Sequence, residues 1–192
     1  DWSSDVCSSD LDIHSVGTVA KILQVMRLPN NLLKVLVEGT VPARITSTIR
    51  TEPFLEVGIT TLPAHADMSD RNLAALVRHA TELFEEFVKD NRNLPPEVLG
   101  AFQNLEDPIR KLYYAAANIP QKVEAKQKIL DAPDIRSQFY ELVQLLTAEI
   151  EMQRLEVEID SKVQDQIQRS QRKYFIQEQI RALQSELGEE DD

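Results

Sequence analysis

The sequence predicts an α+β fold, in which a partial β-rich module is followed by a helical bundle and one very long C-terminal helix. Three observations predict it. The first third of the chain is rich in Val, Ile and Thr and interrupted by Gly and Pro. From Ser69 onward apolar residues recur at helical spacing, and after Pro133 no Pro or Gly occurs until Gly188. β-branched residues suit a pleated surface, whereas an uninterrupted run without Pro or Gly suits a helix.

The β-rich module is expected to cover residues 12–66. Its expected strands are residues 16–24, 33–38, 41–45 and 54–61. Pro29, Asn30 and Asn31 separate the first two strands and predict a hairpin turn, because Asn tolerates positive φ. So few strands need a closing partner or a covering layer. We expect that partner upstream of the first strand.

The helical bundle is expected to cover residues 67–133. Ser69 is suited to cap its first helix, which should end near Asn91. The apolar face of this helix is formed by Leu73, Leu76, Val77, Ala80, Leu83, Phe84 and Phe87. This spacing indicates an amphipathic helix with one buried face.

Prolines mark the starts of the remaining helices of the bundle. Pro96 lies where the first residue of a second helix would lie, and Asp107 with Pro108 predicts the start of a third. Pro120 precedes a short fourth helix. The short connections favour antiparallel neighbours.

The long helix is expected to cover residues 134–188. Asp134 can cap its N-terminus, and its length would be about 80 Å at about 1.5 Å per residue. Its packed start is predicted from Phe139, Leu142, Val143, Leu146 and Ile150. Residues 160–173 are almost entirely polar and predict a solvated shaft. A break near Ser170 is the alternative.

The end of the long helix is expected at Leu187, with Gly188 in the position that follows a helix C-terminus. Residues 189–192 are then a solvated acidic end. Apolar residues return before it, at Tyr174, Phe175, Ile180, Leu183 and Leu187.

Residues 1–11 show neither strand nor helix periodicity and contain the only Trp and Cys of the chain. A DNA string that encodes them resembles a common short-read sequencing adapter. We therefore expect these residues to be a disordered, translated adapter; a natural disordered tail is the alternative. Sequencing the source gene across this junction tests the prediction.

Charge and composition exclude several classes of protein. The formal net charge is −11, which disfavours binding to nucleic acid and to anionic membrane surfaces. No apolar run approaches the length of about 20 residues that a membrane-spanning helix needs. Cys7 is the single cysteine, so an internal disulfide cannot form, which fits the cytoplasm.

The sequence contains no recognisable catalytic or metal-binding motif. It matches neither the phosphate-binding pattern G-x-x-x-x-G-K-[ST] nor the nucleophile pattern G-x-S-x-G. His14, His65 and His79 are far apart and give little support to a zinc site, and His79 is expected at the surface. Glu85 and Glu86 are adjacent on a helix and do not converge. We expect no catalytic, cofactor or metal site.

Three segments carry a family resemblance, in the same order as in the family. Residues 16–45 (VGTVAKILQVMRLPNNLLKVLVEGTVPARI) resemble the β-rich N-terminal module of bacterial Lon proteases. Residues 94–120 (LPPEVLGAFQNLEDPIRKLYYAAANIP) resemble the helical module that follows it. Residues 170–192 (SQRKYFIQEQIRALQSELGEEDD) resemble the end of the long helix. The chain resembles an N-terminal region of Lon, truncated at both ends.

The resemblance implies a function in protein quality control. Lon is a homohexameric, ATP-dependent AAA+ serine protease of the cytoplasm that degrades misfolded and regulatory proteins. Its N-terminal region, whose β-rich part is a PUA-like pseudo-barrel, engages unfolded or tagged substrates and helps to assemble the hexamer. ATP, Mg²⁺ and the protease dyad belong to domains that follow this region, so the chain itself is expected to bind rather than to catalyse.

Tyr174, Phe175 and Ile176 form a candidate protein-interaction patch, because they follow the polar shaft without an evident core. Its partner would be the helix of another Lon subunit or a captured substrate; packing against the ATPase domain is the alternative.

A structural coiled-coil adaptor without a protease is the competing function, and a self-contained enzyme is a third possibility that the missing motifs disfavour. The apolar residues of the shaft step by three, four, four and four: Met152, Leu155, Ile159, Val163 and Ile167. This spacing is closer to 3.6 than to the 3.5 of a heptad, so it does not demand a strong two-stranded coiled coil.

Overall fold

The structure is a computed structural model that describes residues 13–62, 65–91 and 94–189. The adapter-like segment and the expected upstream partner strand therefore lie outside the described residues. The chain divides into two compact units, Asp1–Leu146 and Thr147–Asp192. The sheet and the bundle belong to the first unit. None of the described helices is long and apolar enough to cross a membrane.

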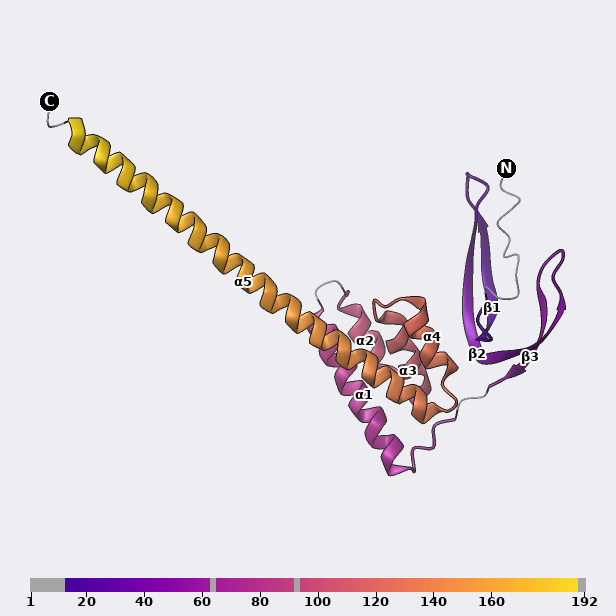
Figure 1. The fold of residues 1–192 in the computed structure, drawn as a ribbon. Coiled ribbons are helices and arrows are strands. Elements are labelled where there is room, and N and C mark those ends of the chain that lie inside the picture. Colours follow the sequence, from indigo (N-terminus) through magenta and orange to yellow (C-terminus); the bar gives the residue numbers. More distant parts are fainter. Residues whose placement is uncertain (1–12, 63–64, 92–93, 190–192) are drawn as a thin grey trace. The chain divides into compact units, whose positions relative to one another are not determined.

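The β-rich part is an antiparallel sheet of three strands in the order β1-β2-β3 (Figure 1). Its strands are β1 (Val16–Arg27), β2 (Leu33–Arg50) and β3 (Glu56–Thr61). The predicted hairpin turn is confirmed: Asn31 has φ 63°, and its N–H donates to the carbonyl of Leu28 at 3.1 Å. With the helices, this sheet confirms the α+β fold.

The prediction of two separate strands at residues 33–38 and 41–45 was wrong, because β2 runs through both. Gly39 and Pro42 suggested a break. Gly39 instead pairs with Ala20 at a register shift between Val19 and Ala20. Pro42 pairs with Thr18, and its carbonyl accepts the N–H of Leu62 at 2.7 Å. A bulge absorbs the irregularity, so the strand continues.

The helices follow the predicted order. They are α1 (Arg71–Asp90), α2 (Glu97–Gln103), α3 (Pro108–Asn118), α4 (Val123–Asp131) and α5 (Ile135–Glu189). Asp107 caps α3 by accepting the N–H of Ile109 at 3.0 Å, and Asp134 caps α5 by accepting the N–H of Ser137 at 2.9 Å. The sequence predicted the cap at Asp134 and a helix start at Asp107 and Pro108.

Two predicted helix starts were wrong by one residue. Asp70, not Ser69, caps α1, because its carboxylate accepts the N–H of Asn72 at 2.9 Å. Ser69 donates instead to Asp67, at 2.6 Å from its hydroxyl, and is held in the preceding turn. Pro96 is the cap residue of α2 rather than its first helical residue.

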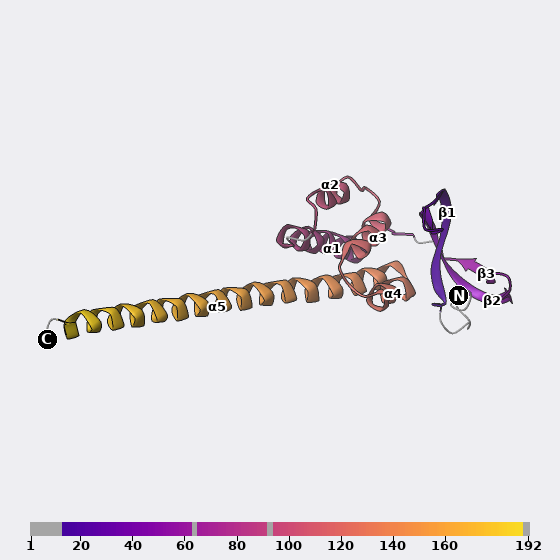
Figure 2. The same cartoon turned by 90° about the horizontal axis from the view of Figure 1, so that it is seen from above.

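Four helices, α1, α2, α3 and α4, and the start of α5 contribute side chains to the core of the first unit. Figure 2 shows these helices from above. Its largest fully buried side chains are Phe84, Phe87, Phe102, Phe139, Leu112, Ile119, Ile129, Leu142 and Leu146. The rings of Phe84 and Phe102 pack in a tilted arrangement with centroids 4.5 Å apart. Arg136 of α5 also forms an ion pair with Asp70, the cap of α1. Apolar burial and this pair fix the start of α5 within the first unit.

α5 is a single helix of 55 residues, so the alternative of a break near Ser170 is wrong. It extends to Glu189, two residues beyond the predicted end, and Gly188 is part of it. Helix ends depend on weak terminal hydrogen bonds, which a cap signal locates only to within a residue or two. Residues 154–185 are all exposed, which confirms the predicted shaft.

Candidate protein-binding groove

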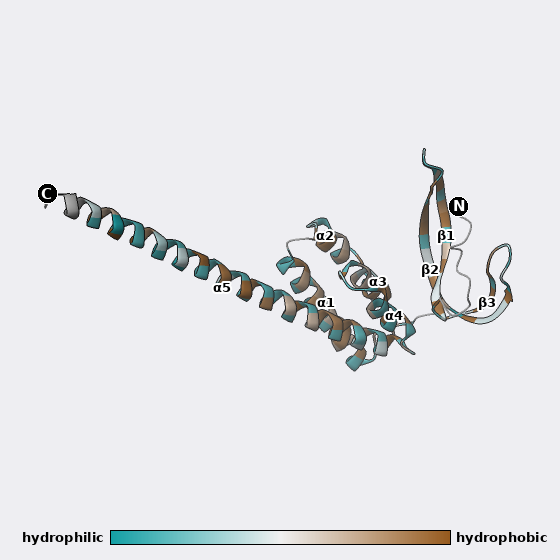
Figure 3. Ribbon diagram, turned by 45° about the horizontal axis from the view of Figure 1, so that its top comes forward, coloured by the Kyte–Doolittle hydropathy of each residue, from teal (hydrophilic) through white to brown (hydrophobic). Residues whose placement is uncertain are grey.

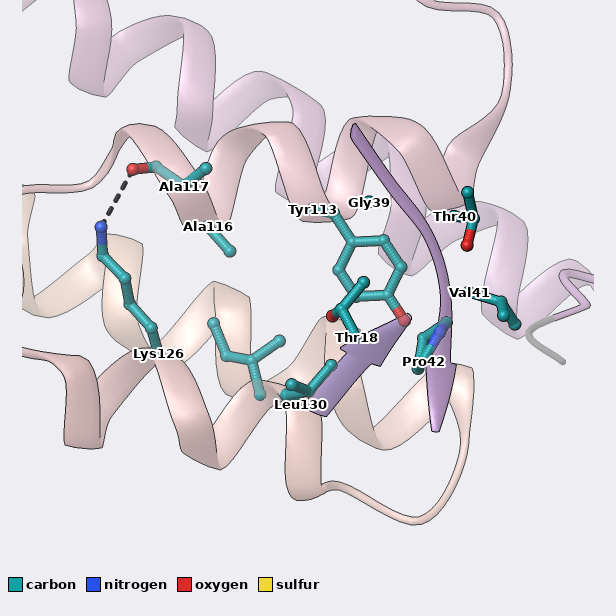
Figure 4. A pocket seen from close by; sticks show the side chains of 11 residues that line it. Thr18, Gly39, Thr40, Val41, Pro42, Tyr113, Ala116, Ala117, Lys126 and Leu130 are labelled. Carbon is teal, nitrogen blue, oxygen red and sulfur yellow. Dashed lines mark hydrogen bonds between the residues drawn. The ribbon is translucent and has the colours of Figure 1, made fainter. Parts of the chain in front are cut away.

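A largely apolar cavity of about 310 Å³ opens between β2 and the pair of helices α3 and α4 (Figure 4). Its lining residues are Thr18, Gly39, Thr40, Val41, Pro42, Tyr113, Ala116, Ala117, Lys126, Ile129 and Leu130. The side chain of Tyr113 extends from α3 toward Thr18 and Pro42, near the middle of the view in Figure 4. Aliphatic side chains and small residues make most of the surface, so the cavity suits an apolar guest.

Two further cavities adjoin this one, with volumes of about 650 and 300 Å³. Both are lined by Pro42 and Tyr113, as the first one is. One extends to Asp107 and Arg110 at the start of α3. The other extends to residues that include Arg44, His65, Asp134 and Gln138. We call the three together the Tyr113 groove.

Tyr113 holds its position through a hydrogen bond to a buried amide. Its hydroxyl donates to Oε1 of Gln138 at 3.2 Å, and Gln138 is only 7% exposed. Burial raises the pKa of the Tyr113 phenol, against the lowering effect of Gln138. The phenol is therefore neutral near pH 7 and keeps its proton for this bond.

Hydrogen bonds tie the walls of the groove together. Nε2 of Gln127 in α4 donates to the carbonyl of Val16 in β1 and to the carboxylate of Asp131, both at 2.8 Å. Nζ of Lys126 donates to the carbonyl of Ala117 at 2.9 Å, shown dashed in Figure 4. The first bond joins sheet to bundle, and the last joins α4 to α3.

Charged residues stand at both ends of the groove. Arg110 lines one end and Arg44 the other, and both side chains are exposed. Neither forms an ion pair with another described residue. Asp107 and Asp134 are already engaged as helix caps. Hydrogen bonds from the backbone and hydroxyl of Ser137 hold the pKa of Asp134 below its usual value.

The structure places the sequence-predicted patch on the solvent-exposed part of α5. Tyr174, Phe175 and Ile176 are 66%, 61% and 45% exposed. Successive residues on a helix are turned by roughly 100°, so these three do not share one face. Ile176 instead shares a face with Ile180 and Leu183, which are 49% and 58% exposed. Apolar and polar residues alternate along α5 (Figure 3).

The described part of the chain contains no cluster of metal-binding side chains. Within residues 13–62, 65–91 and 94–189, no group of three His, Cys, Asp or Glu residues could hold a metal ion. His79 is exposed, as predicted. The arrangement of the groove can bind another molecule through apolar contact and charge.

Sequence reasoning missed the Tyr113 groove; the only candidate that it proposed was the patch on α5. The groove combines residues of the sheet, of α3, α4 and the start of α5, and of the loops between them, which are distant in the sequence. None of these residues belongs to a local motif that would indicate a site. These residues come together only where the sheet lies beside α3 and α4.

A family model described as "ATP-dependent protease La (LON) substrate-binding domain" matches residues 2–148. This match covers both walls of the groove. The chain belongs to the Lon family. This match confirms the prediction, made from three sequence segments, that the chain is an N-terminal region of Lon.

Two Lon proteases illustrate the relationship. The chain is 37% identical to the Lon protease of Xanthomonas oryzae pv. oryzae over 182 residues, which is 95% of this chain and 21% of that protein. It is also 37% identical to the Lon protease of Escherichia coli K12 over 181 residues, or 94% of this chain and 23% of that protein. The chain thus spans less than a quarter of the length of these relatives.

A solved structure supports the same fold. The N-terminal domain of Mycobacterium avium complex Lon protease is similar with a TM-score of 0.60, at 22% identity. The similarity covers 69% of this chain and 70% of that one. The three-stranded sheet, the helices and the long helix α5 of this chain fit this Lon N-terminal fold.

Proposed function

We propose that this chain is the substrate-recognition region of a Lon protease, which binds unfolded or tagged proteins and performs no chemistry itself. The family match to a substrate-binding domain supports a binding role. The observation that supports the proposal most strongly is the Tyr113 groove. It is an open, largely apolar cleft between the sheet and the helices of the bundle. A groove of this kind distinguishes unfolded from folded proteins, because folded proteins bury the apolar side chains that it would accept.

The parent protein would supply the remaining functions. We propose a cytoplasmic, ATP-dependent serine endopeptidase that degrades misfolded and regulatory proteins as a homohexamer. ATP and Mg²⁺ would bind to its ATPase domain. Neither the phosphate-binding pattern nor the nucleophile pattern occurs in this chain.

The exposed part of α5 would serve hexamer assembly. Its apolar side chains are about half exposed at Met152, Leu155, Ile159, Val163 and Ile167. The patch at Tyr174, Phe175 and Ile176 would contact the helix of another subunit or a captured substrate. Packing of the patch against the ATPase domain is the alternative. An exposed apolar stripe lowers its free energy when a partner covers it.

This stripe also favours the second candidate function, a coiled-coil adaptor. An adaptor would associate through α5 but would not bind unfolded protein. Binding of unfolded protein by the chain therefore separates the two functions.

Sedimentation of the chain with a permanently unfolded, reduced and alkylated protein tests the proposal. We expect co-sedimentation with the unfolded protein and none with its native, disulfide-bonded form. Self-association alone, with no difference between the two forms, would support the adaptor and contradict the proposal.

The patch is tested in the full-length protease with Tyr174→Ala and Phe175→Ala together. We expect weaker hexamer formation or slower degradation of unfolded substrate. The control is Gln164→Ala with Gln166→Ala, which removes exposed polar side chains from the same helix. Unchanged assembly and degradation in the first variant would rule out the proposed role of the patch.

A further inference from the structure

The Tyr113 groove has an apolar floor and an exposed arginine at each end. Val41 and Pro42 of β2 face Ala116, Ala117 and Leu130 across the first cavity. Burial of apolar surface here would stabilise a bound segment. This floor accepts many side chains of suitable size, so it gives affinity but little selectivity.

The ends of the groove add selectivity through charge. Arg110 and Arg44 are exposed and unpaired among the described residues, and they lie in the cavities on either side of the floor. A guanidinium forms charge-assisted, often bidentate hydrogen bonds with a carboxylate. Lys126 adds a third positive charge at the floor.

Two acidic residues also line the ends of the groove, but neither forms an ion pair with Arg44 or Arg110. Asp107 accepts the N–H of Ile109, and Asp134 accepts the N–H and the hydroxyl of Ser137. Each carboxylate thus faces the N-terminus of a helix, where the helix dipole is positive. The charged residues that line the groove are three cations, Arg44, Arg110 and Lys126, and two anions, Asp107 and Asp134, on a chain of net charge −11.

We infer that the Tyr113 groove binds unfolded segments in which apolar side chains are flanked by Asp or Glu. This inference rests on the proposed function and specifies its substrate class. The floor takes the apolar side chains, and Arg44 and Arg110 take the flanking carboxylates. Salt weakens binding, because the ends are exposed and screened.

Two labelled peptides test the inference by fluorescence anisotropy with the whole chain. One carries Leu-Val-Phe-Leu between Asp residues on both sides, and the other has Lys in place of every Asp. We expect tighter binding of the Asp peptide, by about tenfold or more, and a decrease of its affinity with added salt. Equal affinity for the two peptides would overturn the inference.

Charge reversal locates the site. The double substitution Arg44→Glu with Arg110→Glu should lower the affinity for the Asp peptide by about tenfold or more. It should raise the affinity for the Lys peptide. The control is Arg71→Glu with Lys128→Glu, which makes the same change in net charge at exposed residues that do not line the groove. An equal loss in both double variants would show a general charge effect and overturn the inference.

Filling the floor provides an independent variant. Ala117→Trp places a large side chain in the first cavity from an exposed position, and it should weaken both peptides. Ala101→Trp, on the exposed side of α2, is its control. Unchanged peptide binding in Ala117→Trp would place the site elsewhere.

The result with unfolded protein separates this inference from the proposed function. If the Arg44→Glu, Arg110→Glu variant still co-sediments with unfolded protein as the unsubstituted chain does, the charged ends do not select the substrate and the inference fails, but the proposed function stands. If the unsubstituted chain fails to bind unfolded protein, the proposed function itself fails. Dimer formation that these substitutions abolish would identify a second copy of the chain as the occupant, and would also overturn the inference.

Discussion

At the scale of single residues, the first unit depends on a cluster of aromatic side chains. Phe84 is fully buried and contacts Phe87, Phe102 and Tyr114, with ring centroids 4.5 to 6.4 Å apart. The sequence predicted Phe84 and Phe87 on the buried face of α1 from their helical spacing. It did not predict their partners in α2 and α3, because contacts between helices leave no periodic signal.

Truncation of Phe84 should destabilise the first unit strongly. Phe84→Ala is expected to lower the free energy of unfolding by about 3–5 kcal/mol, since it removes buried contacts and leaves a cavity. Urea denaturation followed by circular dichroism measures the change. Phe175→Ala is the matched control; because Phe175 is 61% exposed, its effect should stay within about 0.5 kcal/mol. Equal effects would contradict the assignment of the core.

The carboxylate of Asp134 should stabilise the start of α5. Asp134→Ala is expected to cost about 1 kcal/mol, because the N–H of Ser137 loses its acceptor. The pKa of Asp134 is lowered in the fold, so this contribution is present above the unfolded pKa of roughly 3.9 and is lost as pH falls through the lower folded value.

Urea midpoints at pH 7 and in acid measure this contribution. Asp134→Asn is the control, because it keeps a capping oxygen without the charge. The difference between the unsubstituted chain and Asp134→Asn should disappear in acid. A difference that persists when the carboxylate is protonated would contradict the account of the charged cap.

At the scale of elements, the spacing of apolar residues and the residues suited to turns and helix caps predicted most of the helices and strands. Asn31 marked the hairpin, and Asp107 and Asp134 marked two helix starts, because each of these residues has a specific local role. Gly39 and Pro42 misled the assignment of strands. In a bulged strand next to another strand, both residues can be accommodated, and only the pairing with β1 shows this.

The exposed part of α5 should be less stable locally than its packed start. Phe139, Leu142 and Leu146 are buried, whereas residues 154–185 are exposed throughout. Helices in water gain most of their stability from tertiary packing. We expect amide hydrogens of residues 154–185 to exchange faster than those of residues 139–146, as measured by hydrogen–deuterium exchange at low protein concentration. Equal protection would contradict an unpartnered shaft; protection that rises with concentration would instead indicate self-association.

At the scale of the whole molecule, the sequence predicted the family and the binding role but not the groove. Composition and missing motifs disfavoured catalysis, and three ordered segments indicated Lon. The Tyr113 groove depends on how β2 lies against α3 and α4, and a hydrogen bond from Gln127 to Val16 helps to fix it. Such a long-range contact has no counterpart in local sequence pattern.

The most direct test of the account is hydrogen–deuterium exchange of the chain with and without a permanently unfolded protein. The amide hydrogens of both walls of the groove, at residues 39–44 and 110–117, should exchange more slowly when the unfolded protein is present. The native form of that protein should leave their exchange unchanged. Protection confined to other residues, or none at all, would contradict the claim that this groove is where the chain binds unfolded protein.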